Sequence, residues 1–156
     1  MTTTLREPLR ELANRCSLPA ALEAMGERWS FLILRGSFNG LCHFEEFQSE
    51  LGIARNILAN RLSRLVGHGI LERRAVAADR RKIEYRLTEK GRALLPTMVA
   101  LRQWGERWET GVAATPILVD ARDRRPIATV AVHSHDGRVL DKSDLLWALE
   151  ADVLRD

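Results

Sequence analysis

An amphipathic segment at residues 54–67 constrains the fold of this chain more than any other feature. Leu58, Leu62 and Leu65 recur at the spacing of one helical face, which predicts a helix with a buried stripe. A shorter amphipathic segment, residues 44–51, precedes it and ends at a glycine. The sequence therefore predicts two short helices that are joined by a tight turn and share one core.

Two strand-like runs follow this pair of helices. Residues 71–76 form the first run, and residues 82–87 alternate apolar and charged side chains with the period of two of a half-buried strand. Residues 77–81 form a short basic tip between them. Helices followed by a basic hairpin predict a winged helix-turn-helix, a fold that is mainly α with a small β wing (α+β).

Helical spacing predicts three further helices, at residues 18–26, 28–38 and 89–109. The long segment begins after Thr88, whose hydroxyl suits the cap of a helix. It also contains Pro96, which predicts either a kink or a late start of the helix.

The net charge of +3 is unevenly distributed along the chain. Residues 51–92 hold 11 basic and 4 acidic side chains, whereas residues 1–50 and residues 93–156 are each slightly acidic. A basic middle between acidic flanks indicates a surface for a polyanion, and a merely solvated basic face is the alternative.

The polar side of helix 54–67 and the hairpin tip suit double-stranded DNA. Asparagine amides point away from the leucine stripe, and an amide donates and accepts together, which matches the adenine edge in the major groove. Arginines at the start and sides of the helix suit guanine or phosphate, and a basic tip suits the minor groove or the flanking backbone. Ordinary solvated surface is the alternative. The predicted DNA-binding residues are Arg55, Asn56, Asn60, Arg61, Ser63, Arg64, Arg80, Arg81 and Lys82.

Several motifs in this region resemble HxlR-type winged helix-turn-helix regulators, a group of the MarR-like superfamily. The matching segments, in the order expected for that family, are Leu22–Arg35, Phe44–Phe47, Gly52–Leu58, Arg61–Leu65, Gly69–Arg73 and Tyr85–Gly91. The resemblance implies a bacterial, homodimeric transcription factor. We interpret it as a repressor that occupies a pseudo-palindromic operator, with the recognition helix in the major groove.

The segment 89–109 carries an apolar stripe that a small winged-helix core cannot cover. Met98, Leu101, Trp104 and Trp108 lie on the same side of it. Exposed apolar patches usually mark interfaces, so these four residues are the predicted homodimer contact. Packing against the C-terminal part of the same chain is the alternative.

The residue pattern changes near the C-terminal third of the chain, where strand-like runs follow the long helical segment. We expect a DNA-binding and dimerisation domain over residues 1–111 and a small C-terminal α+β extension over residues 112–156. Strand-like runs at residues 115–121 and 127–133 precede a predicted terminal helix over residues 141–153. The sequence indicates no role for this extension.

The two cysteines are candidates for sensing rather than for structure. Cys16 and Cys42 stand apart in sequence, which excludes a disulfide scaffold and a standard cysteine zinc site. The resemblance places Cys16 where HxlR-type redox sensors carry their reactive thiol, and an inert thiol is the alternative. Cys42, beside His43, is a weaker candidate. A small molecule or an oxidant would be the effector of such a regulator.

Neither a cofactor nor a catalytic site is predicted. The sequence contains no phosphate-binding, dinucleotide-binding or serine-nucleophile motif, so the chain is not expected to be an enzyme. His133, His135 and Asp136 would supply three metal ligands, but no fourth ligand accompanies them. A metal-dependent enzyme built on this cluster and a protein–protein adaptor with a winged-helix fold are the two alternatives.

The sequence also indicates where the protein acts. No apolar run approaches the roughly 20 residues of a bilayer-spanning helix. The N-terminal residues contain no apolar signal core. We therefore expect a cytoplasmic protein that contacts no membrane.

Overall fold

The leucine stripe lies at the centre of the fold. In the computed structural model, Leu58, Leu62 and Leu65 of helix α4 (Arg55–Gly67) are fully buried, as predicted. Other elements supply the rest of this core, which also contains Met25, Ile33, Leu34, Phe47, Ile53, Ile70 and Leu71. Burial of about ten apolar side chains in one cluster is the main force that assembles the helices.

The structure describes residues 17–113, 115–148, 151 and 153–154. They belong to two compact units, of which one spans Leu18–Ile117. The other contains the described residues from Leu118 onward, together with Ser17.

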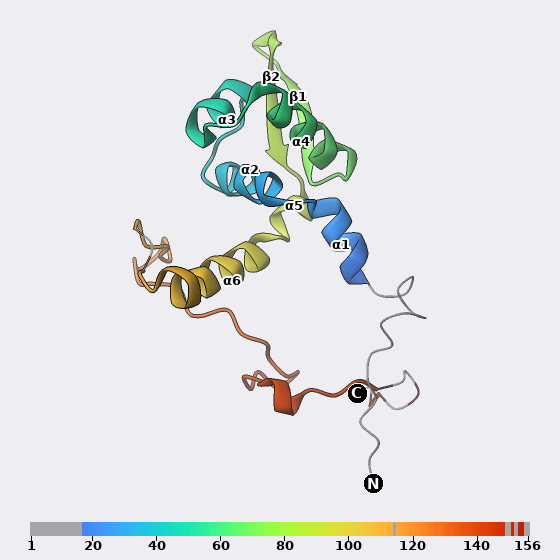
Figure 1. The fold of residues 1–156 in the computed structure, drawn as a ribbon, viewed down its shortest axis with the longest axis vertical. Helices are drawn as coiled ribbons and strands as arrows, with labels where there is room; N and C mark the ends of the chain where they lie inside the picture. Colours follow the sequence, from blue (N-terminus) through green and yellow to red (C-terminus); the bar gives the residue numbers. More distant parts are fainter. Residues whose placement is uncertain (1–16, 114, 149–150, 152, 155–156) are drawn as a thin grey trace. The chain divides into compact units, whose positions relative to one another are not determined.

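The predicted helices before the hairpin are confirmed (Figure 1). They are α1 (Ser17–Met25), α2 (Arg28–Phe38), α3 (Phe44–Leu51) and α4. Helix α3 ends at Gly52, whose φ of 60° is left-handed and therefore suits glycine. Helices α2, α3 and α4 pack against one another, so the turn after Gly52 fixes α4 on the surface of this bundle.

The wing differs in detail from the prediction. Strand β1 (Leu71–Val76) pairs antiparallel with β2 (Asp79–Leu87), so the second strand begins earlier than expected and the turn has only two residues. The register runs regularly as far as the Ala75–Ile83 pair and then jumps to a Val76–Asp79 pair. Three consecutive residues of β2 therefore fall in a bulge at the tip. They are Arg80, Arg81 and Lys82, and all are exposed.

The prediction of one continuous helix over residues 89–109 is wrong. The structure has a single-turn helix α5 (Glu89–Arg92), then α6 (Leu95–Gly105), then a π-helical turn η1 (Glu106–Thr110). Pro96 lies in the first turn of α6, because proline has no N–H to donate to a preceding turn. The alternative of a late start is thus confirmed. The predicted cap is also confirmed, since Thr88 Oγ1 accepts from Gly91 N at 3.0 Å.

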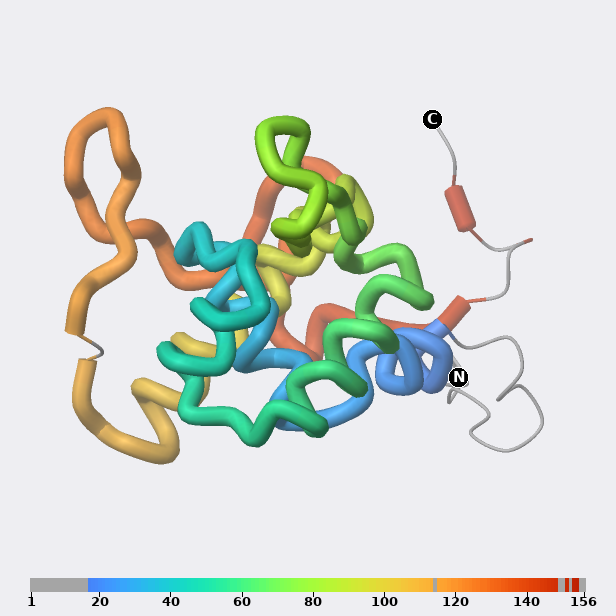
Figure 2. The backbone as a smooth tube through the Cα atoms, turned by 90° about the horizontal axis from the view of Figure 1, so that it is seen from above, coloured from blue at the N-terminus to red at the C-terminus, as the bar shows by residue number. Residues whose placement is uncertain are grey.

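The C-terminal extension contains less regular structure than predicted. The two expected strands reduce to isolated bridges, Val119–Pro126 and His133–Val139, and Figure 2 shows this orange segment as open loops. An isolated hairpin with no helix or further strand against it is marginal in water.

The predicted terminal helix is also wrong for the described residues of its range up to 148. These form only a short 3₁₀ turn, η2 (Lys142–Asp144). Leu146 would face the core on an apolar stripe of the predicted helix, together with Leu145, but it is 72% exposed. Without packing of that stripe, a short helix does not repay its nucleation cost.

Among the residues that the structure describes, no helix combines the length and the apolar character needed to cross a bilayer.

Candidate nucleic-acid interface

The outer side of α4 is polar and open to solvent. Opposite the buried leucine stripe it carries three of the predicted DNA-binding residues, Asn56, Asn60 and Ser63. A fourth, Arg55, stands at the first position of the helix, and all four are exposed. Because the inner side of α4 is fixed by its core contacts, these side chains stand on a rigid element, as base recognition requires.

Arg55 is held at the start of α4 by an aromatic ring. Its guanidinium carbon lies 4.8 Å from the centroid of the Phe44 ring, at the first position of α3. A cation over an aromatic face is attracted by the ring quadrupole. The contact joins the beginnings of the two helices of the helix-turn-helix and positions a positive charge there.

An open groove of about 560 Å³ connects this end of α4 with the wing. Arg55 lines it from α4, and Arg81 and Lys82 line it from the bulge of β2. The tertiary structure thus brings Arg55 together with two adjacent cations, Arg81 and Lys82, that lie about 26 residues further along the chain. Arg80 is exposed at the same tip but does not line the groove.

Two predicted DNA-binding arginines have partners within the chain. Arg61 Nε lies 2.6 Å from Glu27 Oε1, at an angle that is not that of a hydrogen bond, so their attraction is electrostatic. Arg64 Nη2 contacts Glu23 through its carboxylate at 3.3 Å and its carbonyl oxygen at 3.1 Å. Both arginines therefore connect α4 to the α1–α2 region.

The apolar stripe of α6 and η1 is largely uncovered within its unit. Trp104 is 53% exposed and Trp108 is 64% exposed, and Leu101 is also exposed. Met98 differs from them, because it is partly buried and packs against the core. A stripe of this size on the surface of a small domain is typical of an interaction site.

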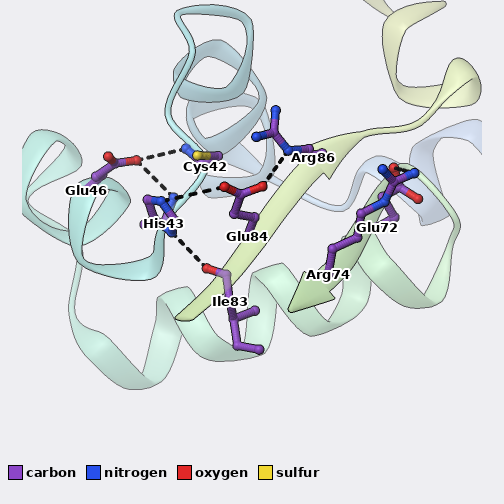
Figure 3. Close-up of polar contacts among 8 residues, drawn as sticks. All are labelled: Cys42, His43, Glu46, Glu72, Arg74, Ile83, Glu84 and Arg86. Atoms are coloured by element: carbon purple, nitrogen blue, oxygen red, sulfur yellow. Dashed lines mark hydrogen bonds and ion pairs between the residues drawn. The ribbon is translucent and has the colours of Figure 1, made fainter. Parts of the chain in front are cut away.

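Sequence reasoning missed a polar cluster between the wing and the loop before α3 (Figure 3), and its His43 also lines the groove of Arg55 and Arg81. Cys42 and His43 immediately precede α3, and Glu84 lies on β2, where the three half-buried side chains meet. Forty residues separate His43 from Glu84, so only the position of the wing strand against the loop before α3 reveals the cluster.

Electrostatics in this cluster favour a neutral thiol and an ionised carboxyl. Burial, followed by the carboxylates of Glu46 and Glu84, raises the pKa of the Cys42 thiol above its ordinary value. A hydrogen bond from Arg86 lowers the pKa of Glu84. A protonated thiol is a poor nucleophile, which argues against Cys42 as the oxidant-reactive cysteine.

The other predicted sensing and metal-binding residues are Cys16, His133, His135 and Asp136. Cys16 lies outside the described residues. His133 and His135 are exposed, and Asp136 accepts a hydrogen bond from the Ser134 hydroxyl. In the described part of the chain, the one group of three potential metal ligands within mutual reach is Cys42, His43 and Glu84, so the histidines of the extension do not assemble such a group.

Comparisons with known proteins relate this chain to transcriptional regulators. The HTH-type transcriptional regulator Rv3095 of Mycobacterium tuberculosis, itself named uncharacterized, is 43% identical over 101 residues. The match covers 65% of this chain and 64% of Rv3095, so it spans less than two thirds of that relative.

Two solved structures extend the comparison. The crystal structure of PA1607, a candidate transcription factor, has a TM-score of 0.81 and 39% identity, and the match covers 88% of this chain and 96% of that one. The redox regulator HypR in its reduced form has a TM-score of 0.53 and 28% identity, with coverage of 59% and 92%.

The family assignment rests on a separate match. Residues 24–112, which are more than half of the chain, match the model of the HxlR-like helix-turn-helix. These residues include α2, the helix-turn-helix pair, the wing and α6, in the order that the winged fold requires. The chain belongs to the HxlR-like helix-turn-helix family.

Proposed function

We propose that this protein is a transcriptional regulator that inserts α4 into the major groove of DNA while the wing tip contacts the adjacent backbone or minor groove. The observation that carries the proposal is the common groove of Arg55, Arg81 and Lys82 beside the exposed amides of α4. One ligand that meets all of these groups is a duplex, whose phosphates flank the base edges.

Different residues have different roles in this proposal. Asn56 and Asn60 read base edges, and Arg55, oriented by Phe44, contacts a guanine or a phosphate. Arg61 and Arg64 position α4 through their ion pairs, since a phosphate contact would require those pairs to break. Arg81 and Lys82 supply sequence-independent affinity.

The functional unit is a homodimer that pairs through α6 and η1. Leu101, Trp104 and Trp108 support it, because pairing removes their exposed apolar surface from water. A twofold dimer presents two α4 helices about one DNA turn apart, or a multiple of it, and so recognises a pseudo-palindrome. Occupation of a promoter at such a site produces repression.

An oxidant or a small molecule is the proposed effector. HypR, a redox regulator, shares 28% identity with this chain, which supports a test of thiol oxidation. Cys16 is the thiol we propose for that role.

Fluorescence anisotropy tests the proposal with the gene's own upstream DNA and a scrambled duplex of the same composition. Asn56→Ala should weaken binding to the upstream DNA about 10-fold and leave binding to the scrambled duplex unchanged, because an amide–adenine pair discriminates by roughly 1–3 kcal/mol. Arg81→Ala should weaken both and lower the salt slope by about 1.

Arg35→Ala is the matched control, since Arg35 is an exposed arginine of α2 that does not line the groove. It should leave both affinities within about 2-fold, which is the scale of a surface substitution. Equal and negligible effects of Asn56→Ala and Arg81→Ala would reject the proposed docking. A repetition with oxidised wild type and oxidised Cys16→Ser tests the effector role of the thiol.

A further inference from the structure

The cluster of Cys42, His43 and Glu84 joins two parts of the proposed DNA-binding surface. Tyr85 N, on β2, donates to Cys42 O at 2.7 Å, which fastens the loop before α3 to the wing strand. The Cys42 sulfur, an imidazole nitrogen of His43 and a carboxylate oxygen of Glu84 all lie within 4.8 Å of one another. Figure 3 shows the three side chains converging from the two segments.

Hydrogen bonds orient two of these groups toward the centre of the cluster. His43 Nδ1 lies 2.9 Å from the carbonyl oxygen of Ile83, which can only accept, so Nδ1 carries the proton. The lone pair is then on Nε2, which lies 3.9 Å from Glu84 Oε1. Histidines that bind metals almost always donate their other N–H to a carbonyl or carboxylate in this way.

The two carboxylate oxygens of Glu84 have different neighbours. Its Oε2 accepts from Arg86 Nε at 2.6 Å, and its Oε1 stays on the side of His43. The guanidinium therefore fixes the plane of the carboxylate and leaves one oxygen for a further partner. Glu46 Oε2 accepts from the backbone nitrogens of Cys42 and His43, at 2.9 Å each, and holds the loop itself.

The spacing approaches that of the ligands of a tetrahedral ion. Ligand atoms at about 2.0–2.3 Å from such an ion lie about 3.3–3.6 Å apart. The separations in the cluster are at most 4.8 Å, so binding requires the three atoms to move closer together by about 1 Å. A thiolate, an imidazole and a carboxylate together select a borderline transition metal over Mg²⁺ or Ca²⁺, which prefer oxygen ligands.

We propose that Cys42, His43 and Glu84 bind a divalent transition-metal ion of the Zn²⁺ class, and that this ion clamps the wing strand β2 to the loop that precedes α3. The thiol proton passes to solvent as the sulfur coordinates, and water occupies the fourth position. The clamp fixes the wing relative to α3, and both elements border the groove that holds Arg55 and Arg81. Any effect of the bound ion on DNA affinity depends on the proposed function, in which α4 and the wing contact DNA.

Binding is tested on the full chain without DNA. Co²⁺, used as a spectroscopic substitute for Zn²⁺, should produce a thiolate-to-metal charge-transfer band at one equivalent, and calorimetry should give the same stoichiometry for Zn²⁺. Cys42→Ser should abolish the band. His43→Asn, which keeps a donor for the Ile83 carbonyl, should lower metal affinity at least about 10-fold, as even the loss of an outer hydrogen-bond partner does.

Two variants act as controls. Cys16→Ser and His135→Gln should keep the band, and all variants are checked by circular dichroism for an intact fold. Absence of the band in wild type, or its persistence in Cys42→Ser, would overturn the site. Loss of metal binding in His135→Gln but not in His43→Asn would assign the metal to the extension and overturn it equally. Glu84→Gln is a second ligand variant that keeps the size of the side chain.

The clamp has its own readout. Hydrogen exchange of the Tyr85 amide should slow when Zn²⁺ binds to wild type and not when it is added to Cys42→Ser. Unchanged exchange in wild type would refute the clamp. A comparison of DNA affinity with and without Zn²⁺ then follows. The metal-binding and hydrogen-exchange measurements contain no DNA. Failure of the first refutes the metal site and failure of the second refutes the clamp, whereas absence of DNA binding refutes the proposed function alone.

Discussion

Arg55 and Phe44, the first residues of α4 and α3, stack with the guanidinium carbon 4.8 Å from the ring centroid. Phe44→Leu removes the stack and keeps an apolar side chain, so Arg55 would lose the orientation that the proposed DNA contact requires. A cation–π contact contributes about 0.5–1 kcal/mol at an exposed site, so affinity for the operator should fall about 2- to 5-fold. Fluorescence anisotropy titration measures this affinity. Phe44→Tyr, which keeps the ring, should bind like wild type, and equal losses in both variants would refute the role of the stack.

The second prediction concerns Trp104 and Trp108. Replacing both by Ser should convert the proposed dimer to a monomer, because the variant has little apolar surface to bury on α6 and η1. Light scattering after size exclusion gives the mass. Trp147→Ser is the matched control, since Trp147 is an exposed tryptophan of the extension. Dissociation by the control rather than by the double variant would place the interface on the extension.

The third prediction concerns Gly91, which lies directly against the carbonyl of Ile70. A Cβ at this position would overlap that oxygen, and the oxygen is held by Thr88 N at 3.1 Å. Gly91→Ala should therefore destabilise the fold by about 1–3 kcal/mol, as overpacking does. Gly105→Ala is the control, because a Cβ there meets open space in α6 and should stabilise by up to about 1 kcal/mol. Urea denaturation gives the free energy of unfolding of each variant. Equal values for Gly91→Ala and Gly105→Ala would contradict the close contact of Gly91 with Ile70.

The fourth prediction concerns acid stability. Hydrogen bonds from the backbone of Cys42 and His43 lower the pKa of Glu46 in the folded state below its ordinary value of 4.5. The stabilisation is thus present above pH 4.5 and is lost as the pH falls through the lower, folded-state pKa. Glu46→Ala should cost about 1 kcal/mol at pH 7, which is typical of a helix-capping contact, and the difference should shrink below pH 4.

Glu46→Gln separates charge from hydrogen bonding in that experiment. Its amide oxygen still accepts from the loop, so it should retain part of the stability at pH 7 without the pH dependence. Thermal unfolding from pH 3 to pH 7 compares the three proteins. A cost of Glu46→Ala that is constant across this range would contradict the assignment.

Local patterns account for the parts of the fold that the sequence predicted correctly. The stripe of Leu58, Leu62 and Leu65 and the cap at Thr88 each depend on residues within one or two turns of the chain. Helical periodicity and capping chemistry are encoded at that range, so the helices and the polar outer side of α4 could be predicted.

Two predictions that rest on apolar spacing were wrong, the continuous helix over residues 89–109 and the helix over the described part of residues 141–153. The apolar spacing of residues 89–109 and 141–153 is helical, but periodicity does not report whether a stripe finds something to pack against. Pro96 lies in the first turn of a new helix because it has no N–H for a preceding turn. Leu146 stays exposed because the packing that would stabilise a helix there involves residues outside the segment.

Only the tertiary structure decided which side chains meet across distant segments. The pairing of β1 with β2 sets the bulge that places Arg81 and Lys82 in one groove with Arg55, and the same strand carries Glu84 to His43. Glu27 and Glu23 likewise engage Arg61 and Arg64 only because α1 and α2 pack beside α4. The sequence by itself determined helices α1 to α4, the presence of the wing and the residue types of the candidate interface, because these follow from neighbours along the chain. The grouping of charges and ligands depends on contacts between residues far apart in sequence, which no local pattern encodes.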